Sequence, residues 1–357
     1  MELIIDNILR EATNLEASDI YMVSGKPLSY KIDGEIKEYS EERLMPEHTF
    51  ALIKDIYAMA SGRDISRVEE AGDDDFSFSL PGVARFRVSA YKQRGTLAAV
   101  IRVVAFDLPD PSSLGIPQVA LDQSNRTKGL VLVTGPTGSG KSTTLSCIID
   151  QINKTRNAHI ITLEDPIEFL HRHDKSIVSQ REISLDTSSY VVALRAALRQ
   201  APNVILLGEL RDSETINIAM TAAETGHLVI STLHTVGAAN TIDRIVDAFP
   251  SNQQGQIRVQ LAMVLQAVIS QQLITGANGH ILPAFEIMLV NDAIRNMIRE
   301  SKIHQIDSVI SSSAADGMIT MDASLLKLFR EGKISDATAI AFATAPEMMR
   351  KRLNAGG

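Results

Sequence analysis

The chain has 357 residues, of which 45% are hydrophobic and 22% charged, ordinary values for a folded protein of two or three domains. A net charge of −8 argues against a nucleic-acid binder, because phosphate backbones attract a basic face, although a basic loop inside a ring would escape that average. The single cysteine, Cys147, excludes a disulfide framework and a zinc site.

The sequence also argues against a membrane-spanning or secreted protein. No apolar run approaches the ~18–20 residues that a helix needs to cross a bilayer. Residues 1–7 carry acids where a signal peptide carries lysine or arginine. We therefore expect a cytoplasmic chain that reaches the cytoplasmic face of the inner membrane only through a partner.

Residues 1–105 predict an N-terminal α+β domain. Apolar residues at helical spacing predict helices over 3–15 and 46–57. Alternating apolar and polar residues, interrupted by Asp-Gly and Pro-Gly turns, predict antiparallel strands. These strands cover 17–23, 28–36 (with its turn at Asp33-Gly34), 73–80, 84–91 and 97–104.

Residues 106–118 predict a linker, because three prolines in this segment prevent a regular element. From 119 to 357 the pattern changes to apolar strands alternating with helical stretches, which indicates a mostly parallel sheet covered on both faces. The predicted strands are 130–133, 159–163, 204–207, 228–231 and a fifth candidate, 281–285. Residues 290–357 predict a helical C-terminal region, with helices over 293–300, 304–311, 321–331, 335–343 and 346–353.

A phosphate-binding loop follows the first of these strands. Its sequence is Gly135-Pro136-Thr137-Gly138-Ser139-Gly140-Lys141-Ser142-Thr143, and a helical pattern comes directly after it. Glycines let the backbone N–H groups point inward at phosphates, and the helix N-terminus adds partial positive charge. Lys141 would neutralise the β- and γ-phosphates and Ser142 would offer its hydroxyl to Mg²⁺. The strand and helix on either side argue against an empty glycine-rich turn, so we expect ATP and Mg²⁺ as ligands.

Polar side chains follow three further strands at the carboxyl edge, where ligands bind in open α/β sheets. Glu209 is our candidate for orienting and polarising the attacking water. Glu164 would support Mg²⁺ or that water, with both acids acting on the metal through water molecules. His234 would contact the γ-phosphate. Taken singly, each of these residues is also compatible with a solvated loop or a structural role.

Four ordered motifs together resemble the hexameric ATPases of type II secretion and type IV pili. The phosphate loop matches. Residues 161–169, ITLEDPIEF, resemble that family's acidic box, and 208–212, GELRD, resemble its Walker B segment, with Gly208 where most P-loop enzymes keep aspartate. Residues 225–235 resemble its histidine box. The resemblance implies a PAS-like N-terminal domain, a RecA-like ATPase domain, a homohexamer, and sensing or supporting roles for Asp165, Arg211 and His227.

Two features resemble the pilus retraction branch of this family. The assembly and secretion branches carry a four-cysteine zinc module and a longer N-terminal region, which this chain lacks. In addition, Ala293-Ile294-Arg295-Asn296-Met297-Ile298-Arg299-Glu300 is similar to a signature of the retraction branch. By spacing alone this segment is a helix with one apolar face and a basic edge shared by Arg295 and Arg299. The resemblance implies that it couples ATP turnover to retraction.

The resemblance further implies that arginines of the N-terminal domain reach a neighbouring subunit's nucleotide. The matching positions are Arg87 and Arg102, while spacing alone favours surface salt-bridge residues at both positions. One departure concerns Ala201-Pro202-Asn203, where the family carries acids before the Walker B strand.

The function implied is ATP-driven pilus retraction, or twitching motility, acting on an inner-membrane platform protein without direct nucleic-acid contact. The alternatives left open are a secretion or conjugation ATPase, a nucleic-acid translocase, and a nucleotide-gated scaffold without enzymatic activity.

Overall fold

The computed structural model describes residues 4–32, 34–60, 62–104 and 108–354. Two compact units make up the chain: Met1–Asp107 with Glu168–Leu170, and Leu108–Ile167 with His171–Gly357. Leu3 of the first predicted helix, Asp33 of a predicted turn, and residues 105–107 around the start of the predicted linker lie outside the described residues.

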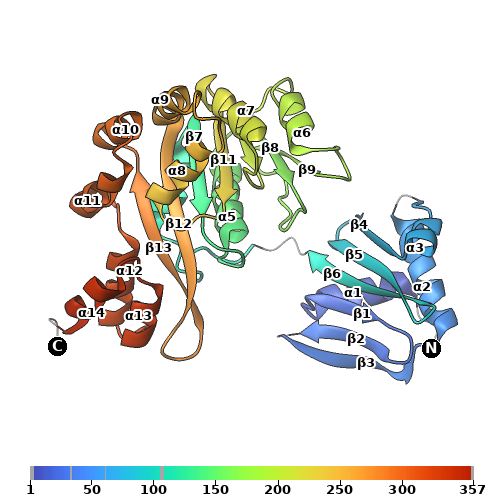
Figure 1. Ribbon diagram of the computed structural model, residues 1–357. Helices are drawn as coiled ribbons and strands as arrows, with labels where there is room; N and C mark the ends of the chain where they lie inside the picture. The colour runs from blue at the N-terminus through green and yellow to red at the C-terminus, as the bar shows by residue number, and fades with distance from the viewer. Residues whose placement is uncertain (1–3, 33, 61, 105–107, 355–357) are drawn as a thin grey trace. The chain divides into compact units, whose positions relative to one another are not determined.

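The first unit is built on a six-stranded antiparallel sheet with strand order β3-β2-β1-β6-β5-β4 (Figure 1). Its strands are β1 (Asp19–Met22), β2 (Pro27–Ile32), β3 (Glu35–Arg43), β4 (Asp73–Leu80), β5 (Ala84–Gln93) and β6 (Thr96–Val104). Its helices are α1 (Ile5–Asn14), α2 (Pro46–Met59) and α3 (Ser66–Ala71). In α1 the apolar positions 5, 8, 9 and 12 are all buried, as a helix that packs on a sheet requires. The predicted strands and the two predicted helices are confirmed; α3 and most of β3, from residue 37 on, were not predicted.

A seven-stranded sheet with strand order β13-β12-β7-β11-β10-β8-β9 organises the second unit (Figure 1). Its strands are β7 (Gly129–Thr134), β8 (His159–Glu164), β9 (Ile177–Glu182), β10 (Val204–Leu207), β11 (Leu228–Leu233), β12 (Leu265–Thr275) and β13 (Ile281–Leu289). All neighbours pair in parallel except β12 and β13, which form an antiparallel hairpin. The carboxyl ends of β7, β8, β10 and β11 therefore meet at one edge of the sheet.

Helices cover both faces of this sheet, which explains why its central strands are apolar throughout. The helices are α4 (Gln118–Leu121), α5 (Lys141–Thr155), α6 (Tyr190–Ala197), α7 (Ser213–Glu224), α8 (Ala238–Asp247), α9 (Gln254–Val264), α10 (Asp292–Arg299), α11 (Ile306–Ser312), α12 (Met321–Arg330), α13 (Asp336–Phe342) and α14 (Pro346–Asn354). Short 3-10 turns lie at Asp122–Asn125, Ile303–Gln305 and Ala314–Asp316.

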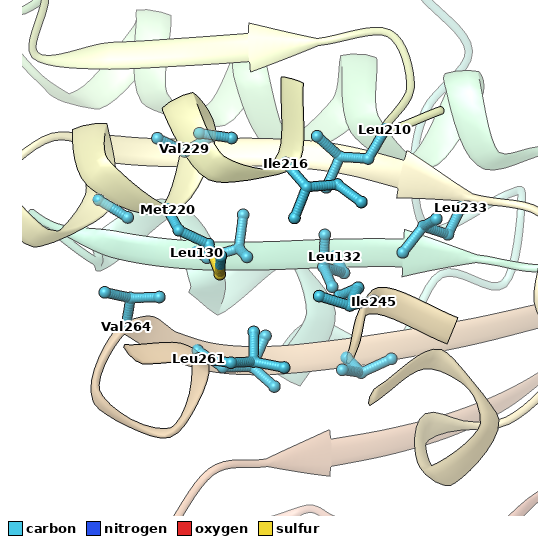
Figure 2. Packing of buried hydrophobic residues seen from close by; sticks show 14 of the residues in the cluster. Leu130, Leu132, Leu210, Ile216, Met220, Val229, Leu233, Ile245, Leu261 and Val264 are labelled. Carbon is cyan, nitrogen blue, oxygen red and sulfur yellow. The ribbon is translucent and has the colours of Figure 1, made fainter. Parts of the chain in front are cut away.

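Alternate residues of β7 enter two separate cores. Leu130 and Leu132 point toward Met220, Ile245 and Leu261 of α7, α8 and α9 (Figure 2). The intervening valines pack against α4 and α5 on the other face. The predicted class, an α+β unit followed by a RecA-like α/β unit with a helical C-terminal part, is confirmed.

Two strands of this sheet were not predicted. The sequence between β11 and β13 was expected to be helical, yet Leu265–Thr275 forms β12, the longest strand of the sheet. Its buried polar residues, Ser270 and Gln271, break the apolar run by which the other strands were recognised. β9 was missed because it is half exposed and carries four polar residues in six.

Candidate nucleotide-binding and catalytic site

The phosphate loop connects β7 to the N-terminus of α5. Gly135, Gly138 and Gly140 all have positive φ, the backbone region that favours glycine. Gly140 is the N-cap of α5 and, in the described chain, no side chain caps this helix. The N–H groups of the first turn of α5 therefore have no intrahelical acceptor and face the loop. This geometry fits an anion at the helix N-terminus.

Lys141 is 8% exposed and its ammonium group lies within the loop. Its Nζ donates to the carbonyl oxygens of Gly135 and Pro136, both at 2.9 Å. The hydroxyl of Ser139 is buried and has no hydrogen-bond partner among the described residues. A buried cation beside an unsatisfied hydroxyl and uncapped N–H groups matches the donor set that a polyphosphate requires. The residues present thus fit the predicted ATP.

Gln271 of β12 packs against the phosphate loop and hydrogen-bonds to the helix that follows it. Its Oε1 accepts a hydrogen bond of 2.7 Å from Thr144 Oγ1 in the first turn of α5. A Cβ added at Gly135 would lie 2.1 Å from the Gln271 carbonyl oxygen, and one added at Gly140 would lie 2.8 Å from Nε2. Gly135 therefore lacks space for a side chain as well as having positive φ, and a side chain at Gly140 would displace the Gln271 amide.

Glu209 and His234 lie side by side after β10 and β11. Glu209 is 16% exposed at its side chain, and one carboxylate oxygen accepts from Arg211 while Oε2 lies 3.3 Å from His234 Nε2. His234 Nδ1 lies 3.5 Å from Lys141 Nζ. Since an ammonium group can only donate, Nδ1 is the acceptor and Nε2 carries the proton that points at Glu209. Lys141, His234, Glu209 and Arg211 form a continuous polar chain.

The electrostatics keep Glu209 ionised. Burial acts to raise its pKa, but the hydrogen bond and charge of Arg211, helped by His234, hold the pKa below its ordinary value. A carboxylate in this state can accept a proton or a hydrogen bond from water.

Glu164 ends the neighbouring strand, β8. Its Oε1 accepts hydrogen bonds from Thr162 Oγ1 at 2.6 Å and Gln180 Nε2 at 3.3 Å. The backbone N–H of Gly208 donates to Leu163 O at 2.8 Å, so the two acidic segments are adjacent. A Cβ added at Gly208 would lie 2.6 Å from the Tyr190 hydroxyl oxygen and 3.5 Å from the Cα of Glu164. This contact explains why glycine replaces the usual aspartate of the Walker B segment.

A cavity of about 470 Å³ opens at this cluster. It is lined by Glu209, Leu210, Arg211, Leu233, His234, Thr235 and Arg244. Arg244 of α8 was not predicted as a site residue, and neither were Gln271 and Tyr190. Arg244 and Tyr190 come from segments with ordinary helical spacing and Gln271 comes from β12, which was not predicted, so no local signal distinguished them.

His227 does not join this cluster. It precedes β11, about 20 Å from the far end of that six-residue strand, and its Nδ1 lies 2.9 Å from Ala222 O. Asp165 is exposed beside Glu164. Asn203, where acids were expected, lies at the start of β10, away from Glu209. Its Oδ1 accepts from the His159 N–H at 2.8 Å, which fastens β10 to β8.

The segment proposed to couple turnover to retraction forms α10. Ile294 and Ile298 are fully buried, and Met297 packs against the same core. Arg295 and Arg299 lie four residues apart on α10, as predicted, but their surroundings differ. Arg295 donates to the carbonyl oxygens of Ala262 and Met263 and so caps α9, whereas Arg299 is exposed.

Arg87 and Arg102 are direct cross-strand partners on β5 and β6 of the first unit. They line a cavity of about 320 Å³ together with Asp19, Asp75, Ser89 and Val100. Arg102 Nε lies 3.1 Å from Asp19 Oδ1, with the arginine 65% and the aspartate 7% exposed. Both guanidinium groups are thus presented on one face of that sheet.

Comparison with known proteins agrees with this geometry. Residues 1–301 match the family model described as type II/IV secretion system protein. The chain belongs to this family. It is 45% identical over 343 residues to the type IV pilus retraction ATPase PilT of Pseudomonas aeruginosa, covering 96% of this chain and 99% of that protein. A twitching motility protein of Neisseria gonorrhoeae is 50% identical over 279 residues, which cover 78% of this chain and 72% of that protein.

A crystal structure of the pilus retraction motor PilT with bound ADP has the same fold. It superposes with a TM-score of 0.89 at 46% identity and covers 98% of this chain and 100% of that chain. The predicted resemblance to the pilus retraction branch, and to its P-loop ATPases, is confirmed. Among the described residues, no helix combines the length and apolarity needed to cross a membrane.

Proposed function

We propose that this chain is a Mg²⁺-dependent ATPase motor that powers type IV pilus retraction, and hence twitching motility. The observation that carries the proposal is the polar chain from Lys141 through His234 to Glu209. It joins a phosphate loop to an ionised carboxylate on a neighbouring strand end. A relative that is 45% identical and matches this chain over nearly the whole length of both proteins is named for pilus retraction, which supports this machine over a secretion or conjugation ATPase.

In this proposal, each residue of the polar chain formed by Lys141, His234, Glu209 and Arg211 has a distinct task in hydrolysis. The loop N–H groups and Lys141 bind the phosphates, and Glu209 accepts a hydrogen bond from the attacking water and orients it in line with the γ-phosphate. His234 lies between Lys141 and Glu209, where its ring contacts the γ-phosphate and reports its presence. Arg211 keeps the Glu209 carboxylate ionised, and Glu164 supports the same water from β8.

Bound Mg²⁺ would neutralise charge that develops between the β- and γ-phosphates. Ser142 is the hydroxyl available to hold it directly, and Glu209 and Glu164 would hold it through water molecules. These ligands are oxygens, as Mg²⁺ prefers.

Assembly completes the site in this proposal. A homohexamer would bring Arg87 and Arg102 of one subunit to the nucleotide of the next, where an arginine is worth 10³–10⁵ in rate in related reactions. Turnover would move the N-terminal unit of one subunit against the ATPase unit of its neighbour. That motion would act on the inner-membrane platform protein of the pilus from the cytoplasmic face.

Deletion of the gene in its host tests the proposal. We expect cells that keep or gain surface pili but do not twitch, with motility restored by the unaltered chain and not by Lys141→Ala. Normal twitching after deletion would contradict a retraction role. Loss of secretion or DNA transfer with normal twitching would instead support the alternative machines.

A further inference from the structure

The hairpin β12–β13 carries three buried polar residues in an otherwise apolar part of the sheet. Ser270, Gln271 and Glu286 are 0%, 4% and 5% exposed. Ser270 and Glu286 face each other directly across the two strands. Burying a carboxylate is costly unless hydrogen bonds satisfy it, so this group of residues needs a reason to be there.

Each polar residue fastens the hairpin to a different segment of the ATPase unit. Gln271 contacts the phosphate loop and the first turn of α5, as described above. Ser270 Oγ accepts a hydrogen bond of 2.9 Å from the N–H of Gly237, three residues after His234. Glu286 Oε1 accepts one of 2.7 Å from the N–H of Ala238, the first residue of α8. The hairpin thus contacts both the first turn of α5 and the segment that follows His234.

The second oxygen of Glu286 reaches the C-terminal helices. Oε2 accepts a hydrogen bond of 3.2 Å from the N–H of Met321, the first residue of α12. One carboxylate therefore caps two helices at once, α8 behind the His234 segment and α12. Two helix N-termini offset the desolvation of this charge, although burial still raises the pKa of Glu286.

The C-terminal helices α12, α13 and α14 pack against this hairpin and share a small core with it (Figure 1). Their core contains Ile274 and Ala284 of the hairpin with Met321, Leu325, Ile334, Ala339, Met349 and Leu353, and it is distinct from the two cores of the main sheet. Asp322 accepts from the N–H groups of Thr344 and Ala345 at 2.6 and 3.2 Å, between α13 and α14. The position of the α12 N-terminus consequently orients the helices that follow it.

We propose that Glu286 is a positioning residue that links the His234 segment to α12, so that nucleotide in the phosphate loop changes the packing of the C-terminal helices. The inference rests on the proposed function only in requiring that the loop bind nucleotide. Glu286 itself touches no reacting atom. It holds two helix ends at a fixed separation, so that a shift of the α8 N-terminus is passed to α12.

A single backbone hydrogen bond can be removed to test this link. Met321 is the first helical residue of α12, where proline is tolerated, and Thr320 before it is extended (φ −79°, ψ 156°), as a residue before proline must be. Met321→Pro therefore removes the N–H that donates to Glu286 and keeps the helix. Met321→Ala is the matched control, because it loses the same buried side chain but retains the N–H.

Hydrogen–deuterium exchange of the purified full chain, with and without Mg²⁺ and an ATP analogue with a non-hydrolysable β–γ bridge, provides the measurement. In the unaltered chain and in Met321→Ala, we expect the analogue to change exchange both in α5 and in residues 321–330. In Met321→Pro the change in α5 should persist and the change in 321–330 should disappear. Glu286→Gln, which keeps the shape but leaves one acceptor for two donors, should behave as Met321→Pro does and serves if the proline variant does not fold.

The outcomes separate the inference from the proposed function. A response in 321–330 that survives both Met321→Pro and Glu286→Gln would overturn the link, as would its absence from the unaltered chain while α5 responds. No response in α5 of the unaltered chain would instead contradict nucleotide binding, and with it both proposals.

Discussion

At the scale of single residues, Gly208 shows how this site differs from most P-loop enzymes. An aspartate at this position would place its Cβ 2.6 Å from the Tyr190 hydroxyl oxygen, so Tyr190 or the backbone would have to move. Tyr190 comes from α6, eighteen positions earlier in the chain. The acidic residues of the site are accordingly Glu164 and Glu209, on either side of the glycine.

Replacing Gly208 tests this steric account. We expect Gly208→Ala to lower the free energy of unfolding by ~1–3 kcal/mol, because overpacking forces neighbouring groups to move. Adding Tyr190→Phe removes the oxygen that the new methyl group meets and should restore part of the loss. Urea denaturation of both single variants and the double variant measures this coupling. If the losses in the free energy of unfolding of the two single variants simply add in the double variant, Tyr190 is not the group that excludes a side chain at position 208.

Glu209 is the residue that we propose orients the attacking water. Glu209→Gln should still bind ATP but lose ~10²–10³-fold in turnover, the effect of removing one group that acts on the transition state. Because the pKa of Glu209 is held below its ordinary value, this carboxylate stays ionised as the pH falls from 8 to 6. Turnover should therefore show no loss from Glu209 protonation in that range.

An exposed acid nearby provides the control for Glu209. Glu214 pairs with Arg195 at the surface, with 57% and 60% of the two side chains exposed. Glu214→Gln should change phosphate release by less than about twofold, as expected for a solvent-screened pair. Near-normal turnover of Glu209→Gln in the same assay would remove Glu209 from its proposed role.

At the scale of elements, α10 separates structural from functional residues within one motif. Ile294 and Ile298 belong to the core and Arg295 caps α9, so losing any of them disturbs packing. Arg299 is exposed, and its Nη1 lies 3.2 Å from Asn296 Oδ1 on the same helix. A loss of retraction is therefore informative when it comes from an exposed residue of this segment, such as Arg299.

Two substitutions in α10 make the distinction measurable. Ile294→Ala should cost ~2–5 kcal/mol of stability, the range for large-to-small changes in a core. Arg299→Ala should leave stability and ATP turnover unchanged but reduce twitching if α10 couples turnover to retraction. Thermal unfolding, phosphate release and a twitching assay on the same variants decide the matter. Unaffected twitching in Arg299→Ala would remove that residue from the coupling role.

The elements also show what sequence patterns can and cannot predict. The strands β7, β8, β10 and β11, and the phosphate loop before α5, were predicted because buried parallel strands are apolar throughout and the loop has a fixed spacing. The strand β12 was not predicted, because its polar residues point at other segments rather than at solvent. Contacts such as Gln271 with Thr144 join residues 127 positions apart and leave no local signal.

At the scale of the whole molecule, the proposed catalytic groups are divided between two units. Lys141, Glu209 and His234 belong to the second unit, and the paired Arg87 and Arg102 to the first. If these arginines complete a neighbour's site, hydrolysis requires assembly, and a ring can convert turnover into relative motion of its units. The central claim is therefore that one chain's phosphate loop works with another chain's arginines.

Mixing two inactive variants tests that claim most directly. Lys141→Ala lacks the loop cation, and the double variant Arg87→Ala, Arg102→Ala lacks the donated arginines, so each alone should barely hydrolyse ATP. In an equal mixture, about a quarter of the interfaces in randomly assembled rings pair an intact loop with intact arginines, and phosphate release should recover to about that fraction of normal turnover. Mixtures that remain inactive, or an unaltered chain that hydrolyses ATP at full rate as a monomer, would contradict the account.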